Sequence, residues 1–273
     1  MKKPDLLPLE KVLPEGQLAS RAWLAKQGFH APRIDAALRS QKLEAVAHGV
    51  YRRPGPPLKW EQVVYSLTQM GHNLHVGGYS ALQHAGMAHY VAFARSEDVD
   101  LYGPTKAPTW LFQYKGGEVI DKNRTVGWNR YFFHVHTRPR FTELSSNAIT
   151  QKLFGTWDWF IPHSTPELAF LELLESVENS ADFDLADKHF ELAGRLRPEL
   201  LNDILAACQS VKVKRLFFWF GKRHAHPWFS ELDRERANLG SGKRMLVRGG
   251  ALDKDYEITV PKEMAHGSDQ SLF

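Results

Sequence analysis

The sequence predicts an α+β protein, in which an N-terminal winged helix-turn-helix is followed by a larger mixed α+β domain with a central sheet. Two observations in the first sixty residues support this: a helix-turn-helix pattern with a basic hairpin between Gly16 and Gly55, and a local excess of positive charge. The third is the mixture of helical and alternating patterns in the rest of the chain. With 273 residues, 43% of them hydrophobic, the chain is long enough for two folded domains.

Two short helices are predicted at the start of this stretch. The first has an apolar stripe at near-helical spacing, formed by Leu18, Ala22, Leu24 and Ala25. Gly28 is well suited to end that helix, because glycine adopts the left-handed conformation without strain. Pro32 can occupy the first turn of the second helix, whose apolar face is formed by Ile34, Ala37 and Leu38. The pattern therefore predicts helix, short turn and helix.

A basic β-hairpin is predicted directly after the second helix. The pattern alternates at Leu43, Ala45 and Ala47, and a turn at His48-Gly49 leads into a returning strand, 50–53. A hairpin that follows a helix-turn-helix is the wing of a winged helix. In such a domain the second helix fits the major groove of DNA and the wing reaches the flanking backbone.

The charge distribution favours DNA binding over an ordinary helical core with solvated arginines. Residues 1–60 contain eleven Lys or Arg and five acids, a net charge of +6, whereas the whole chain has +4 and residues 61–273 therefore have −2. A basic excess confined to the segment with the DNA-binding pattern is expected where phosphates are neutralised. Winged helices also serve as protein-interaction modules, so the fold alone does not decide the function.

Nine residues are the predicted DNA contacts. We expect major-groove contacts from the second helix and its end, and phosphate or minor-groove contacts from the wing and its approach. The first set is Arg33, Arg39 and Ser40, the second is Lys42, His48, Arg52 and Arg53, and Ser20 and Arg21 at the start of the first helix complete the interface.

Pro54-Gly55-Pro56-Pro57 can continue neither a strand nor a helix, and we place the domain boundary there. The predicted parts are a DNA-binding domain over 1–55, a C-terminal α+β domain over 58–264 and a flexible tail over 265–273. Helices are predicted over 5–13, 60–69, 80–85, 184–192 and 198–208, with another that begins at Pro166 after Thr165. Strands are predicted over 99–102, 109–112, 131–135, 211–220, 244–247 and 256–260.

No pattern predicts a catalytic residue, a metal site or a cofactor. The pairs His134/His136 and His224/His226 lack a cysteine or a nearby carboxylate at ligand spacing. The run 240–244 resembles the end of a phosphate-binding loop, but Ala237 stands where that motif needs glycine and Arg244 where it needs Ser or Thr. A nuclease would need acids and a lysine at a strand end, for which Lys212, Lys214, Glu191 and Glu199 are not at diagnostic spacing.

A second basic cluster lies among the aromatic residues of the C-terminal half. Basic and aromatic side chains that alternate in this way can bind a nucleic acid. Equally, the aromatic residues can form the core face of one strand and the basic residues its solvent-exposed face. The cluster comprises Lys212, Lys214, Arg215, Lys222 and Arg223, with Arg244 further along the chain.

Three features of the sequence suggest the cellular compartment of the protein. The single cysteine, Cys208, cannot form an intrachain disulfide, no apolar run is long enough to span a membrane, and the polar start of the chain lacks a signal-peptide core. We expect a cytoplasmic protein without a membrane partner.

The N-terminal pattern resembles the winged helix of AbiEi-family antitoxins, the repressors of type IV (AbiE) toxin–antitoxin and abortive-infection systems. The matching landmarks there are Ser20-Arg21, Gly28-Phe29, Leu38-Arg39-Ser40 and Gly49-Val50-Tyr51-Arg52. Further landmarks resemble the longer Gram-negative members and extend the likeness over most of the chain. They are Val76-Gly77-Gly78, Ser80-Ala81-Leu82, Gly86, His89-Tyr90, Thr165-Pro166-Glu167-Leu168-Ala169 and Ser210-Val211-Lys212-Val213-Lys214-Arg215.

This resemblance implies a non-enzymatic autorepressor that binds double-stranded operator DNA at inverted repeats. It also implies that the C-terminal domain counteracts an AbiEii-like nucleotidyltransferase toxin, with or without stable direct contact. If so, the expected antitoxin surface is the second basic cluster, Lys212, Lys214, Arg215, Lys222 and Arg223. Two alternatives stay open: a nuclease or other DNA-processing enzyme that uses the winged helix to find its substrate, and a plain transcriptional regulator whose C-terminal domain senses a ligand or oligomerises.

Overall fold

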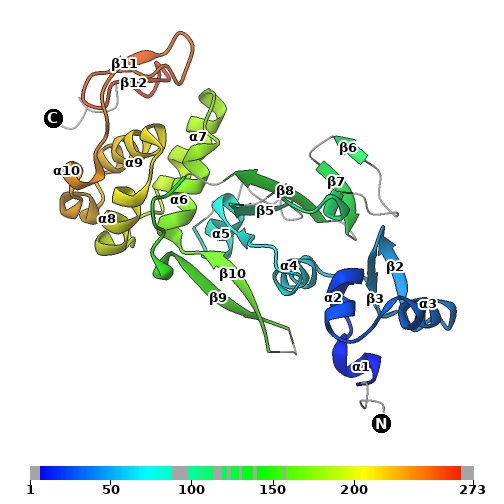
Figure 1. The fold of residues 1–273 in the computed structure, drawn as a ribbon. Helices are drawn as coiled ribbons and strands as arrows, with labels where there is room; N and C mark the ends of the chain where they lie inside the picture. Colours follow the sequence, from blue (N-terminus) through cyan, green and yellow to red (C-terminus); the bar gives the residue numbers. More distant parts are fainter. Residues whose placement is uncertain are drawn as a thin grey trace. The chain divides into compact units, whose positions relative to one another are not determined.

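The structure is a computed structural model, and it describes residues 7–87, 98–104, 106–112, 119–121, 124–128, 131–137, 140–155 and 158–265. The chain forms two compact units (Figure 1). The first unit comprises Met1–His75, Glu97–His136 and Gln151–Ile161, and the second comprises Val76–Ser96, Thr137–Thr150 and Pro162–Phe273. Each unit is therefore assembled from several separate stretches of sequence.

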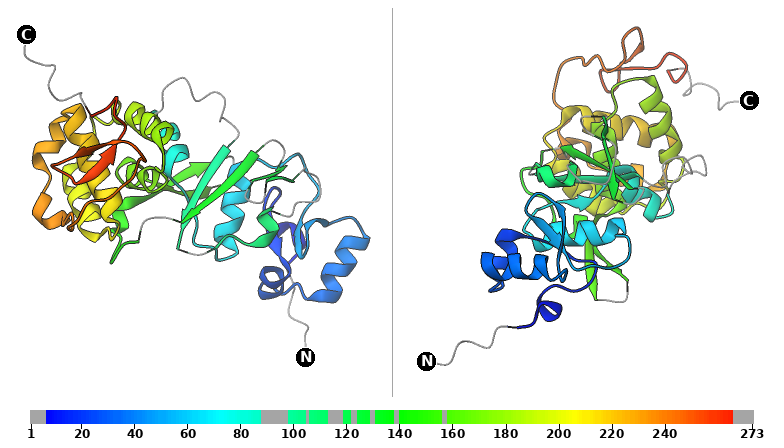
Figure 2. Two further views of the ribbon diagram at one scale, coloured as in Figure 1. Left: turned by 90° about the horizontal axis from the view of Figure 1, so that it is seen from above. Right: turned by 90° about the vertical axis from the view of Figure 1, so that its right-hand side faces the viewer.

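The N-terminal residues form a winged helix-turn-helix. Its elements, coloured blue in Figures 1 and 2, are α1 (Leu9–Val12), β1 (Leu18–Ser20), α2 (Arg21–Lys26), α3 (Ala31–Arg39), β2 (Glu44–Ala47) and β3 (Val50–Arg52). The three strands are antiparallel in the order β1-β3-β2, with Ala19 opposite Tyr51 and Ala45 opposite Tyr51 from the other side. Their buried side chains share one core with the helices, formed by Leu9, Leu13, Ala19, Leu24, Phe29, Ile34, Ala37, Leu43 and Tyr51.

Local chemistry explains the ends of these helices. The Ser20 hydroxyl caps α2 by accepting a hydrogen bond from the Trp23 amide at 3.1 Å. Gly28, at φ +84°, makes the turn into α3, and Pro32 lies in the first turn of α3 as predicted. The sequence prediction was wrong about Leu18, which lies in β1 rather than in the first helix, because a three-residue strand leaves no alternation to detect.

Helix α4 (Trp60–Gln69) packs on the winged helix within the first unit. The Ser66 hydroxyl accepts a buried hydrogen bond from the Leu18 amide at 2.8 Å, so it binds the backbone of β1. On the same helix Tyr65 stacks on Trp159, with the ring centroids 4.3 Å apart. The helix itself is where the sequence predicts it, whereas its contact with β1 is not visible in any local pattern.

Seven strands are hydrogen-bonded in the order β6-β7-β8-β5-β4-β10-β9. Their bounds are β4 (His75–Val76), β5 (Asp98–Gly103), β6 (Val119–Asp121), β7 (Arg124–Trp128), β8 (Tyr131–Thr137), β9 (Ile149–Phe154) and β10 (Trp159–Ser164). The predicted strands 99–102 and 131–135 are confirmed. The predicted strand 109–112 is wrong, since Thr109–Phe112 forms a 3-10 helix with Trp110 and Leu111 buried.

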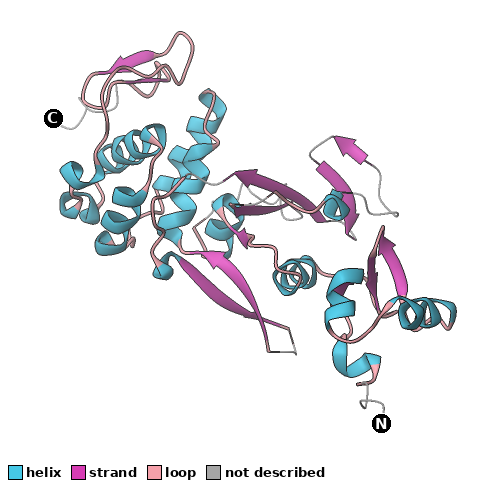
Figure 3. Cartoon of the chain, in the orientation of Figure 1, coloured by secondary structure: helices cyan, strands magenta, loops and turns pink. Residues whose placement is uncertain are grey.

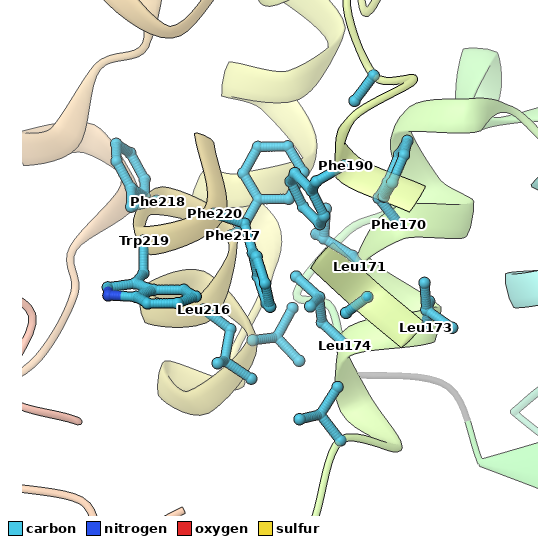
Figure 4. Packing of buried hydrophobic residues seen from close by; sticks show 14 of the residues in the cluster. Phe170, Leu171, Leu173, Leu174, Phe190, Leu216, Phe217, Phe218, Trp219 and Phe220 are labelled. Carbon is cyan, nitrogen blue, oxygen red and sulfur yellow. The ribbon is translucent and has the colours of Figure 1, made fainter. Parts of the chain in front are cut away.

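The second unit is mainly helical (Figure 3). Its helices are α5 (Gly78–His84), α6 (Pro166–Glu175), α7 (Ser180–Phe190), α8 (Pro198–Ala207), α9 (Val211–His224) and α10 (Arg234–Ala237). Phe190 of α7 is at the centre of their core, with ring centroids 4.6 Å from Phe170 of α6 and 4.9 Å from Phe220 of α9 (Figure 4). Helix α6 begins at Pro166 as predicted, although the Thr165 side chain makes no capping hydrogen bond.

The largest correction to the sequence prediction is α9. The run from Val211 to Phe220 was expected to be a central strand, but it forms a helix of 14 residues whose middle is buried on every side. An alternating start followed by a continuous apolar run fits a buried strand and a buried helix equally well. The residues at the two ends are those that favour a helix: Ser210 is the N-cap, and Lys222, Arg223 and His224 form a basic last turn. The apolar pattern between them does not include these signals.

A small hairpin of β11 (Ala251–Asp253) and β12 (Ile258–Val260) follows the helices. A closing hairpin is expected from the sequence, but its first strand lies later than predicted, and the predicted 244–247 segment contributes only a bridge from Arg244 to Ile258. The predicted tail lies outside the described residues from 266 onward. In the described part of the chain, no helix combines the length and apolar composition that crossing a lipid bilayer requires.

Candidate nucleic-acid interface

The solvent face of α3 carries an acid and a base one turn apart. Asp35 and Arg39 are both exposed, at spacing i and i+4, with the small side chain of Ala36 beside them. Arg21, the first residue of α2, donates a hydrogen bond to Asp35 at 3.2 Å and another to the Tyr51 hydroxyl at 3.1 Å. The face therefore presents one fixed carboxylate and one guanidinium.

Three of the nine predicted contacts have exposed side chains without an internal role. Arg39 ends α3, Lys42 follows it and His48 lies at the tip of the wing, where Gly49 has φ +71°. Among the described residues, no hydrogen bond or ion pair is recorded for these three side chains. Their polar ends are therefore available to a ligand.

The other predicted contacts have partners inside the domain or are less exposed. The Ser20 hydroxyl caps α2, and the Ser40 hydroxyl donates to the Ala37 carbonyl at 3.3 Å. Arg52 pairs with Glu44 of β2 and donates to the Pro56 carbonyl at 3.0 Å, so it braces the wing. Arg53 is half-buried.

Arg33 lies on the flank of α3 rather than on its outer face. Its guanidinium carbon is 3.7 Å from the centroid of the Phe29 ring, and its Nη2 donates to the Leu7 carbonyl at 2.9 Å. The helical spacing places Arg33 on this flank too, and the attraction of the guanidinium to the ring holds the side chain against the domain.

Asp35 is a candidate that the sequence prediction omitted, because an acid is unexpected in a phosphate-binding surface. A carboxylate on a recognition helix can accept a hydrogen bond from the N4 amino group of cytosine. The Arg21 guanidinium would orient it for that contact. The Tyr51 hydroxyl and Asp35 in turn raise the pKa of Arg21 above its usual value.

The predicted basic surface of the C-terminal half is not formed as expected. Lys214 and Arg215 are buried in the second unit, with exposed fractions of 6% and 2%. Lys214 donates to the Ala237 carbonyl at 2.7 Å, and Arg215 donates to the carbonyls of Leu239 and Gly242 at 2.8 and 2.6 Å. These side chains hold the following loop in place and cannot belong to a surface.

The remaining three residues of that cluster also have partners. Lys212 donates to the Glu175 carbonyl at 2.7 Å, Lys222 pairs with Asp255, and Arg223 pairs with Asp187 at 3.0 Å. Exposed cations lie instead on the loop that Arg215 anchors, where Lys243, Arg244 and Arg248 have exposed side chains. The sequence signal for this loop was the Gly-Ser-Gly-Lys-Arg run.

The histidines of the pair His134/His136 lie close to carboxylates, although the sequence shows none at ligand spacing. His136 Nε2 is 2.7 Å from Asp100 Oδ1 and His134 Nε2 is 3.3 Å from Asp98 Oδ1, from β8 to the neighbouring strand β5. His224 likewise meets Asp187 at 2.7 Å. The partners come from distant sequence positions, so spacing along the chain could not find them. Among the described residues, no group of three or more His, Cys, Asp or Glu has the arrangement of a metal site.

Comparisons with known proteins agree over both halves of the chain. Residues 2–93 match the family described as the N-terminal domain of the AbiEi antitoxin transcriptional regulator, and residues 96–261 match the family described as transcriptional regulator, AbiEi antitoxin, type IV TA system. Among curated proteins no relative matches this sequence.

A solved structure has a similar fold. It is the crystal structure of the RV2827C protein from Mycobacterium tuberculosis, with a TM-score of 0.52 and 11% sequence identity over 89% of this chain and 86% of that one. At this identity the likeness concerns the fold alone. The family matches go further, because together they extend over almost the whole sequence. The chain belongs to the AbiEi family of transcriptional regulators, the antitoxins of type IV toxin–antitoxin systems.

Proposed function

We propose that the chain represses transcription of its own operon by binding double-stranded operator DNA at inverted repeats. The observation that supports this most directly is the outer face of α3, with Asp35 and Arg39 exposed one turn apart and Lys42 and His48 exposed beside it. Repression takes place on chromosomal DNA, so the proposed compartment is the cytoplasm.

In this proposal each exposed group has its own task. Arg39 donates two hydrogen bonds to guanine, and Asp35 accepts one from cytosine. Lys42, His48 and Arg53 contact phosphates, as does the part of the Arg21 guanidinium that its partners leave exposed. Ser20, Ser40 and Arg52 support the interface from within, since their recorded hydrogen bonds are to the domain itself.

Variants of two neighbouring residues test this division. Arg39→Ala should reduce discrimination between operator and unrelated DNA at low salt by about 1–3 kcal/mol. Lys42→Ala should weaken binding to all sequences alike and reduce the slope of log K against log salt by about 1. Fluorescence anisotropy with the DNA upstream of the gene measures both quantities.

The control is Lys11→Ala, which removes an exposed cation from α1, an element outside α2, α3 and the wing. It should leave both quantities unchanged. If a folded Arg39→Ala/Lys42→Ala double variant binds operator DNA as the unmodified chain does, α3 is not the recognition helix.

We further propose that the second unit acts as the antitoxin and neutralises a nucleotidyltransferase-like toxin encoded beside it, without enzymatic turnover of its own. Because Lys214 and Arg215 are buried, we remove them from the predicted antitoxin surface. Lys222 and Arg223 stay in it, and the exposed Lys243, Arg244 and Arg248 join it.

Co-expression with the neighbouring toxin gene tests this proposal through the rescue of growth. Charge reversal at Lys243, Arg244 and Arg248 should abolish rescue while repression of a reporter persists. The matched control reverses Lys188, an exposed cation of α7. Full rescue by the triple variant would remove this loop from the antitoxin surface.

A further inference from the structure

A groove of about 420 Å³ lies in the first unit, between the start of the chain and the flank of α3. Its apolar lining includes Leu9 of α1, Phe29 of the turn and Ala37 of α3. Its charged lining residues are the cations Arg33 and Lys42 and the acid Glu10, so the lining has a net charge of +1. The size is in the range of small-molecule sites, which also combine an apolar body with a few polar groups.

Arg33 is the unusual member of this lining. The ring of Phe29 fixes its guanidinium, and Nη2 has the Leu7 carbonyl as its acceptor. Its Nη1 is buried and has no hydrogen-bond partner among the described residues. A buried donor of a charged group that lacks an acceptor is costly, and such a group in a folded protein calls for an explanation such as an absent ligand.

The second cation of the groove has no recorded partner either. Lys42 is exposed directly after α3, and among the described residues no ion pair is recorded for it or for Glu10. The neighbouring Ser40 hydroxyl is occupied by the Ala37 carbonyl, so it offers an acceptor rather than a second donor. Two cations and one acid around an apolar floor match a ligand with one negative charge and an apolar body.

We propose that this groove binds a small aromatic carboxylate. The carboxylate pairs with the Arg33 guanidinium and with Lys42, and the ring lies on Leu9 and Ala37. Guanidinium and carboxylate form charge-assisted hydrogen bonds, which are the strongest that the groove can offer.

Binding in the groove should oppose binding to DNA, a consequence that rests on the proposed function. Lys42 is both a proposed phosphate contact and a wall of the groove, and Arg39 lies on the same helix. A bound anion neutralises Lys42 and places a negative charge close to the DNA phosphates. Because coupling between two ligands is reciprocal, operator DNA must weaken carboxylate binding by the same factor.

Isothermal titration calorimetry of the full chain with 2-naphthoate tests the site without DNA. We expect saturable binding of one equivalent, with 2-naphthamide and acetate at least about tenfold weaker because each lacks either the charge or the ring. Arg33→Gln and Lys42→Gln should each weaken 2-naphthoate about tenfold, whereas Arg39→Gln, on the same helix but outside the groove, should leave the affinity unchanged.

Two variants keep the test decisive even if Arg33→Gln loses its fold. Lys42→Gln alters only an exposed side chain, and Arg33→Lys keeps the charge without the forked donors. Absence of saturable 2-naphthoate binding, or equal affinity in the unmodified chain and in folded Lys42→Gln, overturns the site. If 2-naphthoate binds as expected but operator DNA affinity is independent of it, the antagonism is wrong and the site stands. If operator DNA does not bind even without 2-naphthoate, the proposed function fails separately.

Discussion

The arginines of the winged helix show that charge in a sequence is different from charge available to a ligand. Arg39, at the end of α3, has no partner among the residues that the structure describes, whereas Arg52 pairs with Glu44 and donates to the carbonyls of Pro56 and Gly55. Arg52→Ala should therefore lower the free energy of unfolding by about 1–2 kcal/mol, because three acceptors lose their donor. Lys42→Ala should leave stability unchanged. Urea unfolding of both variants measures the difference, and equal stabilities would show that Arg52 does not brace the wing.

Glu167 offers a prediction about pH within the second unit. Burial alone would raise the pKa of its carboxyl group, but hydrogen bonds from the side chain and backbone of Arg197 outweigh burial and hold the pKa below its usual value. A carboxyl group with a lowered pKa in the folded state stabilises the fold above its unfolded pKa, and this contribution is lost as pH falls through the folded pKa.

Glu167→Gln should accordingly lower the free energy of unfolding at pH 7 by about 1–3 kcal/mol, since it exchanges a charged acceptor for a neutral one. The difference between the variant and the unmodified chain should begin to shrink as the pH falls below the unfolded pKa of glutamate, about 4.3, and should continue to shrink until the pH has passed the lowered pKa of Glu167 in the folded state. Urea unfolding at pH 7, 5 and 3.5 tests this. A difference that is the same at all three values would mean that the ionised form of Glu167 contributes nothing.

At the scale of elements, the winged helix was predictable and α9 was not. Gly28, Pro32 and His48-Gly49 are local signals with a direct backbone meaning: the structure has turns at Gly28 and at His48-Gly49, and Pro32 lies in the first turn of α3. In α9 the buried, charged residues Lys214 and Arg215 are adjacent to an apolar run. This sequence pattern is also typical of a strand with one solvent-exposed face. Their acceptors are backbone carbonyls at 237, 239 and 242, which no pattern around residue 214 reveals.

The same distinction applies to the candidate interface. Sequence spacing predicted α3 and the wing as its elements, and three of the residues that it named, Arg39, Lys42 and His48, are exposed in the structure. Their contact with DNA stays a prediction. It could not foresee that Phe29 captures Arg33 or that Arg21 orients Asp35, because these contacts depend on how two helices pack. Contacts across elements are decided by the tertiary fold.

Helix α9 and the C-terminal loop should unfold together because Arg215 joins them. Arg215→Met keeps an apolar stem of similar length but leaves the Leu239 and Gly242 carbonyls without their donor, and it should cost about 3 kcal/mol. Hydrogen exchange followed by mass spectrometry should show faster exchange at residues 239–250 than in the unmodified chain. The control Lys222→Met removes an exposed pair with Asp255 and should cost less than about 1 kcal/mol. A similar loss of stability in both variants would contradict the anchoring role of Arg215.

At the scale of the whole molecule, each of the two compact units combines stretches that are separated in the sequence. The predicted boundary at Pro54–Pro57 stays a prediction, but residues beyond it take part in the first unit, since the Ser66 hydroxyl of α4 accepts from the Leu18 amide. Fragments that end before and after α4 test how far the DNA-binding part extends. The core of the winged helix lies entirely between Leu9 and Tyr51, so residues 1–57 contain all of it.

We therefore expect residues 1–57 to fold with low stability and residues 1–72 to fold with higher stability, because only the longer fragment keeps the acceptor for Leu18 and the cover that α4 provides. Both should bind operator DNA, since the outer face of α3 is complete in each. Residues 58–273 should bind it poorly, because removal of a segment with ten Lys or Arg and five acids leaves them with a net charge of −1. Circular dichroism melts and anisotropy titrations measure the two properties. If residues 58–273 bind operator DNA as tightly as the full chain, the recognition surface lies outside the winged helix.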